Sequence, residues 1–319
     1  MDLFIKFLVA AVGAGTPLLF GTVGEILNEK VGHLNLGVEG MMAIGACAGF
    51  MAGYLTDNFA LALLAAFAAG VLSALIYAVL TVTFLANQNV AGLTMTIFGV
   101  GLSNFIGVYM LDKSGASTLK LPENVTAQMR SVTIPGLSDL PVVGELLFSY
   151  NPFVYIGILV AAVCGFYLYR TKTGLNVQAI GENPAAADAA SIQVTRWKYI
   201  NILLGGGICG IGGLYYVLDY NQGIWATTGQ IEALGWLAVA LVIFTTWKPL
   251  NAIWGAYLFG ALRVLKYYKM GFMAGWPDAF FDMLPFLITA LILVITSIRG
   301  SKGAHIPASL GVNYFREER

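Results

Sequence analysis

Long apolar stretches, separated by short polar breaks, repeat along almost the whole chain. A membrane-spanning helix needs about 20 mostly apolar residues, and several stretches reach that length. Their apolar positions do not alternate as in a membrane β-barrel, so we expect helices. The pattern predicts about nine spans (eight to ten), at residues 3–26, 37–56, 59–86, 90–111, 151–170, 199–219, 232–247, 250–266 and 281–298.

Basic residues predict how these spans are oriented, because Lys and Arg accumulate on the cytoplasmic side of a membrane. Residues 170–198 and the tail 299–319 each hold four of them. Four predicted spans separate these segments, so both face the cytoplasm and the N-terminus lies outside. The extracytoplasmic segments 112–150 and 267–280 leave room for a further re-entrant helix. The first apolar stretch lacks a basic leader and a cleavage site, so we expect it to be retained.

Composition supports an all-α integral membrane protein with a single transmembrane domain, residues 1–319. Apolar residues make up 58% of the chain and charged residues 11%, against roughly 25% charged in soluble domains. The formal net charge of zero argues against a nucleic-acid surface. Cys47, Cys164 and Cys209 lie in apolar stretches and are expected to be small buried side chains. The two histidines, His33 and His305, do not form a zinc-binding pattern.

The segment at residues 171–198 contains the signals of a short helix. Asn183 is a suitable N-cap, Pro184 suits the first helical position, and an alanine-rich run follows. Thr195 is expected to cap the next span. Small side chains would let another protein approach the helix backbone at the cytoplasmic surface. The alternative is an interfacial helix that only connects two spans.

Four segments together resemble one family of membrane proteins. They read VGHLNLGVEGMM (31–42), TGLNVQAIGENPAAA (173–187), TWKPLNA (246–252) and PASLGVNYFREER (307–319). They are similar, in order, to the first-half signature, coupling segment, second-half turn and C-terminal ending of permeases of ATP-binding cassette importers. The branch is that of simple sugars, nucleosides and branched-chain amino acids. The chain is most similar to its nucleoside members, which work with purine-binding basic membrane lipoproteins.

The resemblance implies a permease subunit in a bacterial inner membrane, surrounded by lipid, that moves a nucleoside or simple sugar by alternating access. It also implies a second, related permease chain, a cytoplasmic ATPase and an extracytoplasmic substrate-binding lipoprotein. No Lys follows a Gly, so a Gly-Lys-Ser/Thr phosphate loop is missing from the sequence. ATP and Mg²⁺ are therefore expected on the ATPase, and no catalytic residue, cofactor or metal site on this chain.

The resemblance also predicts which residues couple the permease to the ATPase. Ser191 stands where the family usually has Gly, and His33 where it more often has an aliphatic residue. The predicted coupling residues are Gly174, Ala179, Gly181, Glu182, Asn183, Pro184, Ala187, Ala189 and Ser191.

Four polar residues near or within spans are candidates for the translocation path. Glu39 lies at a helix start, where the helix dipole favours a carboxylate, and acidic residues near spans are often functional. The alternative is that Glu39 has only a structural role, with its carboxylate satisfied by backbone amides. Asn35 is expected to cap the same helix, Asn89 to lie in a cytoplasmic turn or inner gate, and Asn104 to bond a neighbouring helix or line the path.

Two other function classes remain at this stage. An ion-coupled secondary transporter would need paired acidic residues within spans, and the sequence offers only Glu39 as a candidate. A membrane-embedded enzyme would need converging His, Asp or Glu side chains, and the chain has two histidines.

Overall fold

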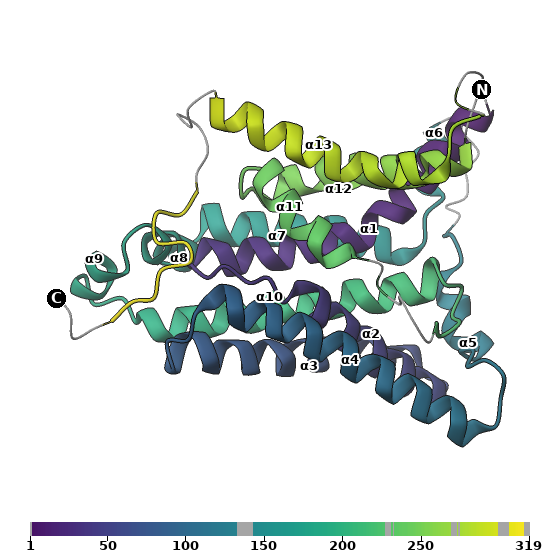
Figure 1. Ribbon diagram of the computed structural model, residues 1–319, viewed down its shortest axis with the longest axis horizontal. Helices are drawn as coiled ribbons and strands as arrows, with labels where there is room; N and C mark the ends of the chain where they lie inside the picture. The colour runs from purple at the N-terminus through teal and green to yellow at the C-terminus, as the bar shows by residue number, and fades with distance from the viewer. Residues whose placement is uncertain are drawn as a thin grey trace.

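The computed structural model describes residues 2–132, 143–226, 231, 233–268, 273, 275–298 and 306–315. Its longer helices run roughly along one common axis (Figure 1). They are α1 (Asp2–Lys30), α2 (Val38–Thr56), α3 (Phe59–Ala78), α4 (Gln88–Ser114), α7 (Pro152–Arg170), α10 (Val194–Asp219), α11 (Leu234–Phe244), α12 (Pro249–Val264) and α13 (Asp278–Ile298). Shorter elements are η1 (Val79–Thr83, a π-helical turn), α5 (Glu123–Thr126), η2 (Ala127–Met129), α6 (Val143–Phe148), α8 (Lys172–Glu182), α9 (Pro184–Ala189) and η3 (Leu265–Tyr268).

The predicted all-α membrane fold is confirmed. Within the described ranges, six helices are long and apolar enough to cross a membrane: α1, α2, α3 continued by η1, α4, α7 and α10. The predicted span at 232–247 corresponds to α11, which has 11 residues and is too short to cross a membrane. Such a helix rises about 16 Å, roughly half the thickness of the hydrocarbon core. The total of nine spans stays a prediction.

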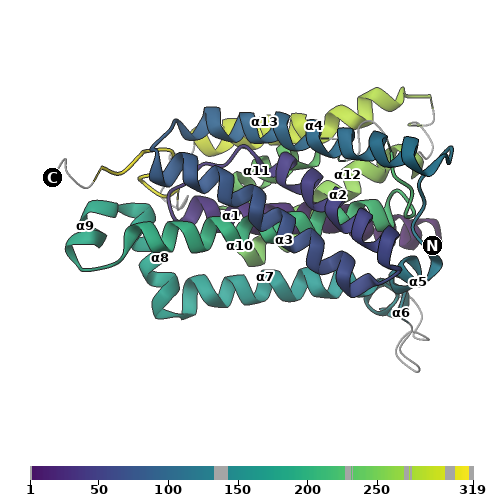
Figure 2. The ribbon, with the colours of Figure 1, turned by 90° about the horizontal axis from the view of Figure 1, so that it is seen from below.

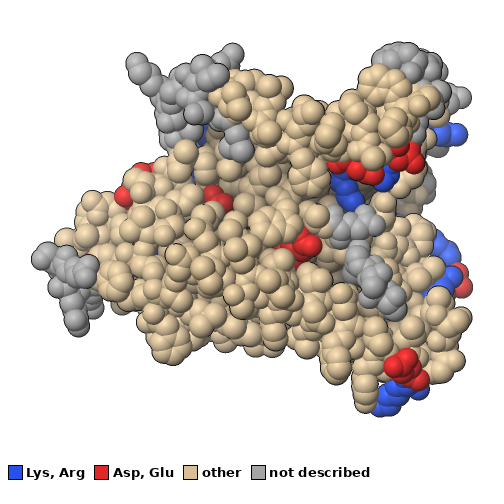
Figure 3. Space-filling model, viewed as in Figure 1, with Lys and Arg blue, Asp and Glu red and all other residues tan. Residues whose placement is uncertain are grey.

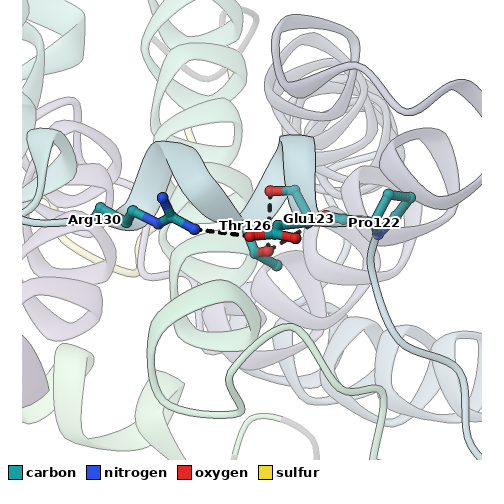
Figure 4. Close-up of polar contacts among 4 residues, drawn as sticks. All are labelled: Pro122, Glu123, Thr126 and Arg130. Carbon is teal, nitrogen blue, oxygen red and sulfur yellow. Dashed lines mark hydrogen bonds and ion pairs between the residues drawn. The ribbon is translucent and has the colours of Figure 1, made fainter.

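The connection between α4 and α7 forms short helices in its described part rather than another span. It is tied to the connection that follows α10 by two backbone hydrogen bonds, Leu121 N–H to Gly223 O and Trp225 N–H to Leu119 O, both 2.9 Å. An exposed ion pair of 2.8 Å joins Arg130 to Glu123 across α5 and η2 (Figure 4). The backbone bonds therefore fix this connection at the end of the bundle.

The helix α10 forms the centre of the bundle, and glycines let its neighbours touch its backbone. A Cβ atom at Gly45 of α2 would collide with Gly210, one at Gly70 of α3 with Gly206, and one at Gly24 of α1 with Gly205. Small residues allow such close packing of membrane helices without a cavity. The helices α1, α2, α3 and α10 therefore form one closely packed core.

Large apolar side chains cover much of the outside. Phe105 and Ile97 on α4 are 68% and 75% exposed, and Trp254 on α12 is 80% exposed. Figure 3 shows one face on which most side chains are uncharged and the charged ones form small groups. A surface of this kind suits lipid or another apolar protein surface rather than water.

Both predicted cytoplasmic segments meet at one end of the bundle. Figures 1 and 2 place α8, α9 and residues 306–315 together there, with the N-terminus at the other end. The charge pattern predicted that the two segments share one side and that the N-terminus lies on the other, and this relative placement is confirmed. His305 and the tail residues 299–305 and 316–319 lie outside the described residues.

Candidate translocation and coupling sites

The chain unwinds between α1 and α2 and runs back into the bundle. This unwound segment (residues 31–37) leads from the end of α1 toward the middle of the molecule, where α2 begins (Figures 1 and 2). Gly37, its last residue, packs against Met95 and Gly92 of α4. Irregular backbone is tolerated at such depth only where protein or a polar cavity surrounds it.

Side chains of three helices satisfy the backbone of the unwound segment. Leu34 donates its N–H to Gln88 Oε1 (2.8 Å) and accepts a hydrogen bond from the Tyr77 hydroxyl (2.8 Å). The Leu36 carbonyl accepts from the Thr96 hydroxyl (2.8 Å). The N–H of Asn35 donates to Glu25 Oε1 (3.0 Å). These bonds replace those that a regular helix would make internally.

A buried acidic pair lies one helical turn apart near the end of α1. Glu25 is completely buried and also accepts a hydrogen bond of 2.8 Å from the Asn28 side-chain amide. Glu29, 1% exposed, accepts from the indole nitrogen of Trp247 in the turn after α11. The sequence analysis missed this pair, because it ended the first span at residue 26 and so left Glu29 between two spans.

His33, in the unwound segment, is buried and has no hydrogen-bond partner for either ring nitrogen among the described residues. Burial, and after it the nearby Lys198 ammonium, lower the pKa of His33 well below its usual range. The imidazole packs edge-on against Tyr77, with ring centroids 6.5 Å apart.

Two helices begin next to each other in the interior, and Glu39 lies at their junction. A Cβ atom at Gly235 of α11 would collide with the Glu39 backbone, so the first turns of α2 and α11 touch. From there α2 runs toward the end that holds α5, where Asn124 bonds Asp57 (2.6 Å). The helix α11 runs the opposite way, toward Glu29. The partial positive charges of both helix N-termini therefore face this junction.

The Glu39 carboxylate lies beside the backbone amides of Ala233 and Trp236 at the start of α11. Its Oε2 atom is buried and has no hydrogen-bond partner among the described residues, although the residue as a whole is half-buried. Backbone amides thus support the charge, while one oxygen remains able to accept a further hydrogen bond.

The four path candidates do not form one cluster. Asn35 is buried and accepts a hydrogen bond from the Gly37 N–H (2.9 Å); the N-cap of α2 is Gly37, so the predicted capping by Asn35 is wrong in detail. Asn89 is exposed at the start of α4, and Asn104 is half-buried further along that helix. The neighbouring Gln88, which the sequence analysis did not single out, is the buried residue of that turn.

The coupling segment (residues 171–198) holds two helices, α8 and α9, rather than one. The predicted start of the second is confirmed: the Asn183 side chain accepts from the Ala186 N–H (3.0 Å), and Pro184 is the first helical residue. Thr195 is not a cap, because α10 begins at Val194 with Gln193 as its N-cap. The added helix α8 begins at Lys172, and the hydroxyl of its N-cap Thr171 accepts a hydrogen bond from the Gly174 N–H (3.0 Å).

The predicted coupling residues divide into an inner and an outer group. Gly174 and Gly181 are buried where a Cβ atom would collide with the Tyr167 and Lys30 carbonyl oxygens, respectively, and Ala187 is also buried. These residues hold the segment against α7 and α1. Pro184 is half-buried, and the outer group is exposed: Ala179, Glu182, Asn183, Ala189 and Ser191.

Ser191 has a left-handed backbone conformation, with φ at 64°. This conformation costs an L-residue about 1–2 kcal/mol, part of which Gly recovers. We expect Ser191→Gly to stabilise the protein by up to about 1 kcal/mol without lowering uptake. Thermal unfolding in detergent tests this, with Ala190→Gly as the control because Ala190 has φ at −82°. Equal melting temperatures for the two variants would contradict the expectation.

Discontinuous helices that unwind inside a helical bundle are typical of membrane transport proteins. A family model described as the permease component of branched-chain amino acid transport systems matches residues 7–295. The chain belongs to this family.

Curated relatives match over most of their length. A Haloferax volcanii protein, provisionally assigned as the glucose ABC transporter permease TsgC13, is 35% identical over 83% of this chain and 78% of its own. The guanosine ABC transporter permease NupQ of Bacillus subtilis is 32% identical over 95% of this chain and 94% of its own. The nucleoside ABC transporter permease NupC of Lactococcus lactis is 28% identical over the same shares.

Proposed function

We propose that this protein is the permease subunit of an ATP-binding cassette importer that moves a nucleoside, or a simple sugar, across the bacterial inner membrane. The observation that carries the proposal is the coupling segment, which presents exposed small residues while Gly174 and Gly181 hold it against the bundle. Relatives named for guanosine, nucleoside and glucose transport support the substrate class.

The importer needs partners that supply energy and substrate. A cytoplasmic ATPase binds ATP and Mg²⁺ and docks on the outer residues of the coupling segment, such as Ala179 and Ala189. A second, related permease completes the path; the relatives include a second guanosine permease, NupP of Bacillus subtilis, beside NupQ. An extracytoplasmic lipoprotein delivers the substrate. ATP binding favours one of two states of the bundle, and the permease alternates between them.

Uptake measurements test the substrate class. In cells that express the complete transporter, we expect labelled guanosine to accumulate in an ATP-dependent manner. An excess of unlabelled nucleosides should compete better than glucose. Competition by glucose alone would assign the sugar class instead, and ATP-independent uptake would contradict the importer.

Glu39 is the residue that we propose to meet the substrate in the path, because its free carboxylate oxygen suits a ribose or sugar hydroxyl. We expect Glu39→Gln to lower uptake about tenfold, since losing a charge-assisted hydrogen bond costs about 1.4 kcal/mol. Membrane abundance should not change. The control is Glu123→Gln, an exposed carboxylate on α5. Equal uptake by both variants would leave Glu39 with a structural role only.

One observation favours the ion-coupled alternative. Glu25 and Glu29 form a buried acidic pair, which the sequence analysis did not find. Both carboxylates, however, accept hydrogen bonds within the bundle, from Asn28 and Asn35 and from Trp247, respectively. Collapsing the ion gradient while ATP is maintained separates the two mechanisms: uptake persists in an importer and stops in an ion-coupled carrier.

A further inference from the structure

The described part of the C-terminal tail crosses the end of the bundle that holds the coupling segment. This C-terminal strap (residues 306–315) is nonhelical and lies beside α8 and α9 (Figures 1 and 2). Ser309 bonds the Gly181 carbonyl at the end of α8 through both its N–H (2.9 Å) and its hydroxyl (2.6 Å). The Gly311 N–H donates to the Gly32 carbonyl (3.3 Å) in the unwound segment.

The end of the strap bonds the helix α9. The Tyr314 hydroxyl donates to Asp188 Oδ2 (2.9 Å), and Asp188 lies on α9. Tyr314 also lines, with Asp188 and Arg196, a groove of about 680 Å³ beside the start of α10. Movement of α9 would therefore move the end of the strap directly.

The same strap contacts the turn between α3 and α4. The Asn313 side-chain amide donates to the backbone carbonyls of Leu85 and Ala86, the latter at 3.2 Å. Its Oδ1 atom accepts a hydrogen bond from Gln88 Nε2 (3.1 Å). Gln88 in turn accepts from the Leu34 N–H (2.8 Å). An unbroken series of contacts thus runs from α9 through Tyr314, Asn313 and Gln88 to the unwound segment.

We propose that the C-terminal strap carries the movement of α9 to the unwound segment, with Tyr314, Asn313 and Gln88 as positioning residues. The inference rests on the proposed function, because the ATPase is what moves α9. A change at α9 reaches Leu34 through three side chains, and the unwound segment continues directly into the first turn of α2 with Glu39. The strap therefore links energy input to the candidate path independently of the contact between Gly181 and Lys30.

The test uses the complete transporter with Asn313→Ala, which removes the contacts to the α3–α4 turn, and Tyr314→Phe, which removes one hydroxyl. The control is Val312→Ala, since Val312 is 59% exposed. We expect each test variant to keep its ATPase through purification and to hydrolyse ATP normally. Uptake per ATP hydrolysed should fall about fivefold to tenfold, which corresponds to a loss of about 1–1.4 kcal/mol of coupling.

A double-mutant cycle tests the series of contacts itself. Asn313→Ala and Gln88→Ala should together lower uptake per ATP much less than the product of their separate effects, because both interrupt the same link. Unchanged coupling in Asn313→Ala and Tyr314→Phe, or independent effects in the cycle, would overturn the strap proposal alone. Loss of ATPase binding in these variants would also overturn it, because the strap would then help the ATPase to bind rather than transmit movement. Failure of the unmodified chain to bind any ATPase would overturn the proposed function.

Discussion

Replacing Gly181 with valine is expected to abolish uptake while the protein still inserts into the membrane. A side chain there collides with the Lys30 carbonyl oxygen at the end of α1 and comes within 3.3 Å of Pro307. Because both neighbours are held by the bundle, α8 must move away from α1. The ATPase can then still move the coupling segment, but the segment no longer transmits that movement to α1 and the rest of the bundle. We expect uptake per ATP to fall by more than about tenfold, a loss of at least 1.4 kcal/mol of coupling.

The matched control is Gly101→Val on α4, because a Cβ atom at Gly101 meets nothing within 4 Å. It adds the same side chain to an exposed helical glycine, so it reports any general effect on insertion. Membrane abundance and ATP hydrolysis are measured beside uptake for both variants. Normal uptake by Gly181→Val would refute the role of the coupling segment, and a bulky residue at Pro184 provides a second test of it.

Replacing Glu25 with alanine is expected to cause a large loss of stability. The substitution leaves two buried donors without their acceptor, the Asn35 N–H and the Asn28 side-chain amide. Each unsatisfied buried group costs about 1–3 kcal/mol, so the free energy of unfolding should fall by about 2–6 kcal/mol for the two groups. The melting temperature in detergent and the abundance in the membrane should both fall.

Glu25→Gln separates the hydrogen bonds from the charge. The amide keeps one acceptor oxygen of similar shape, so it can satisfy one of the two donors. We expect the free energy of unfolding of Glu25→Gln to lie between that of the native protein and that of Glu25→Ala. A melting temperature of Glu25→Ala equal to the native value would show that the unwound segment does not depend on this carboxylate.

The sequence predicted the helices well where an apolar stretch ends at a strong local signal. Asn183 and Pro184 defined the start of α9, and the predicted span at 151–170 differs from α7 by one residue. Such signals act over a few residues, so they can be recognised without the tertiary structure. The left-handed Ser191 likewise lies where the family usually has Gly.

The interior of the site could not be predicted in the same way. Glu29 lies in a polar-looking stretch, but it is buried in the structure, where the distant Trp247 donates a hydrogen bond to it. The bond between Asn313 and Gln88 joins residues 225 positions apart, so no local pattern indicates it. The span at 232–247 was overestimated, because an apolar stretch does not reveal that its helix begins inside the bundle. These features arise from packing between remote parts of the chain.

The glycine contacts around α10 also determine when the core of the bundle can form during synthesis. The ribosome synthesises α1, α2 and α3 long before residue 219 completes α10. Until then, Gly24, Gly45 and Gly70 have no partner backbone to contact. The close packing of the first three helices against α10 therefore cannot form until about two thirds of the chain has been translated.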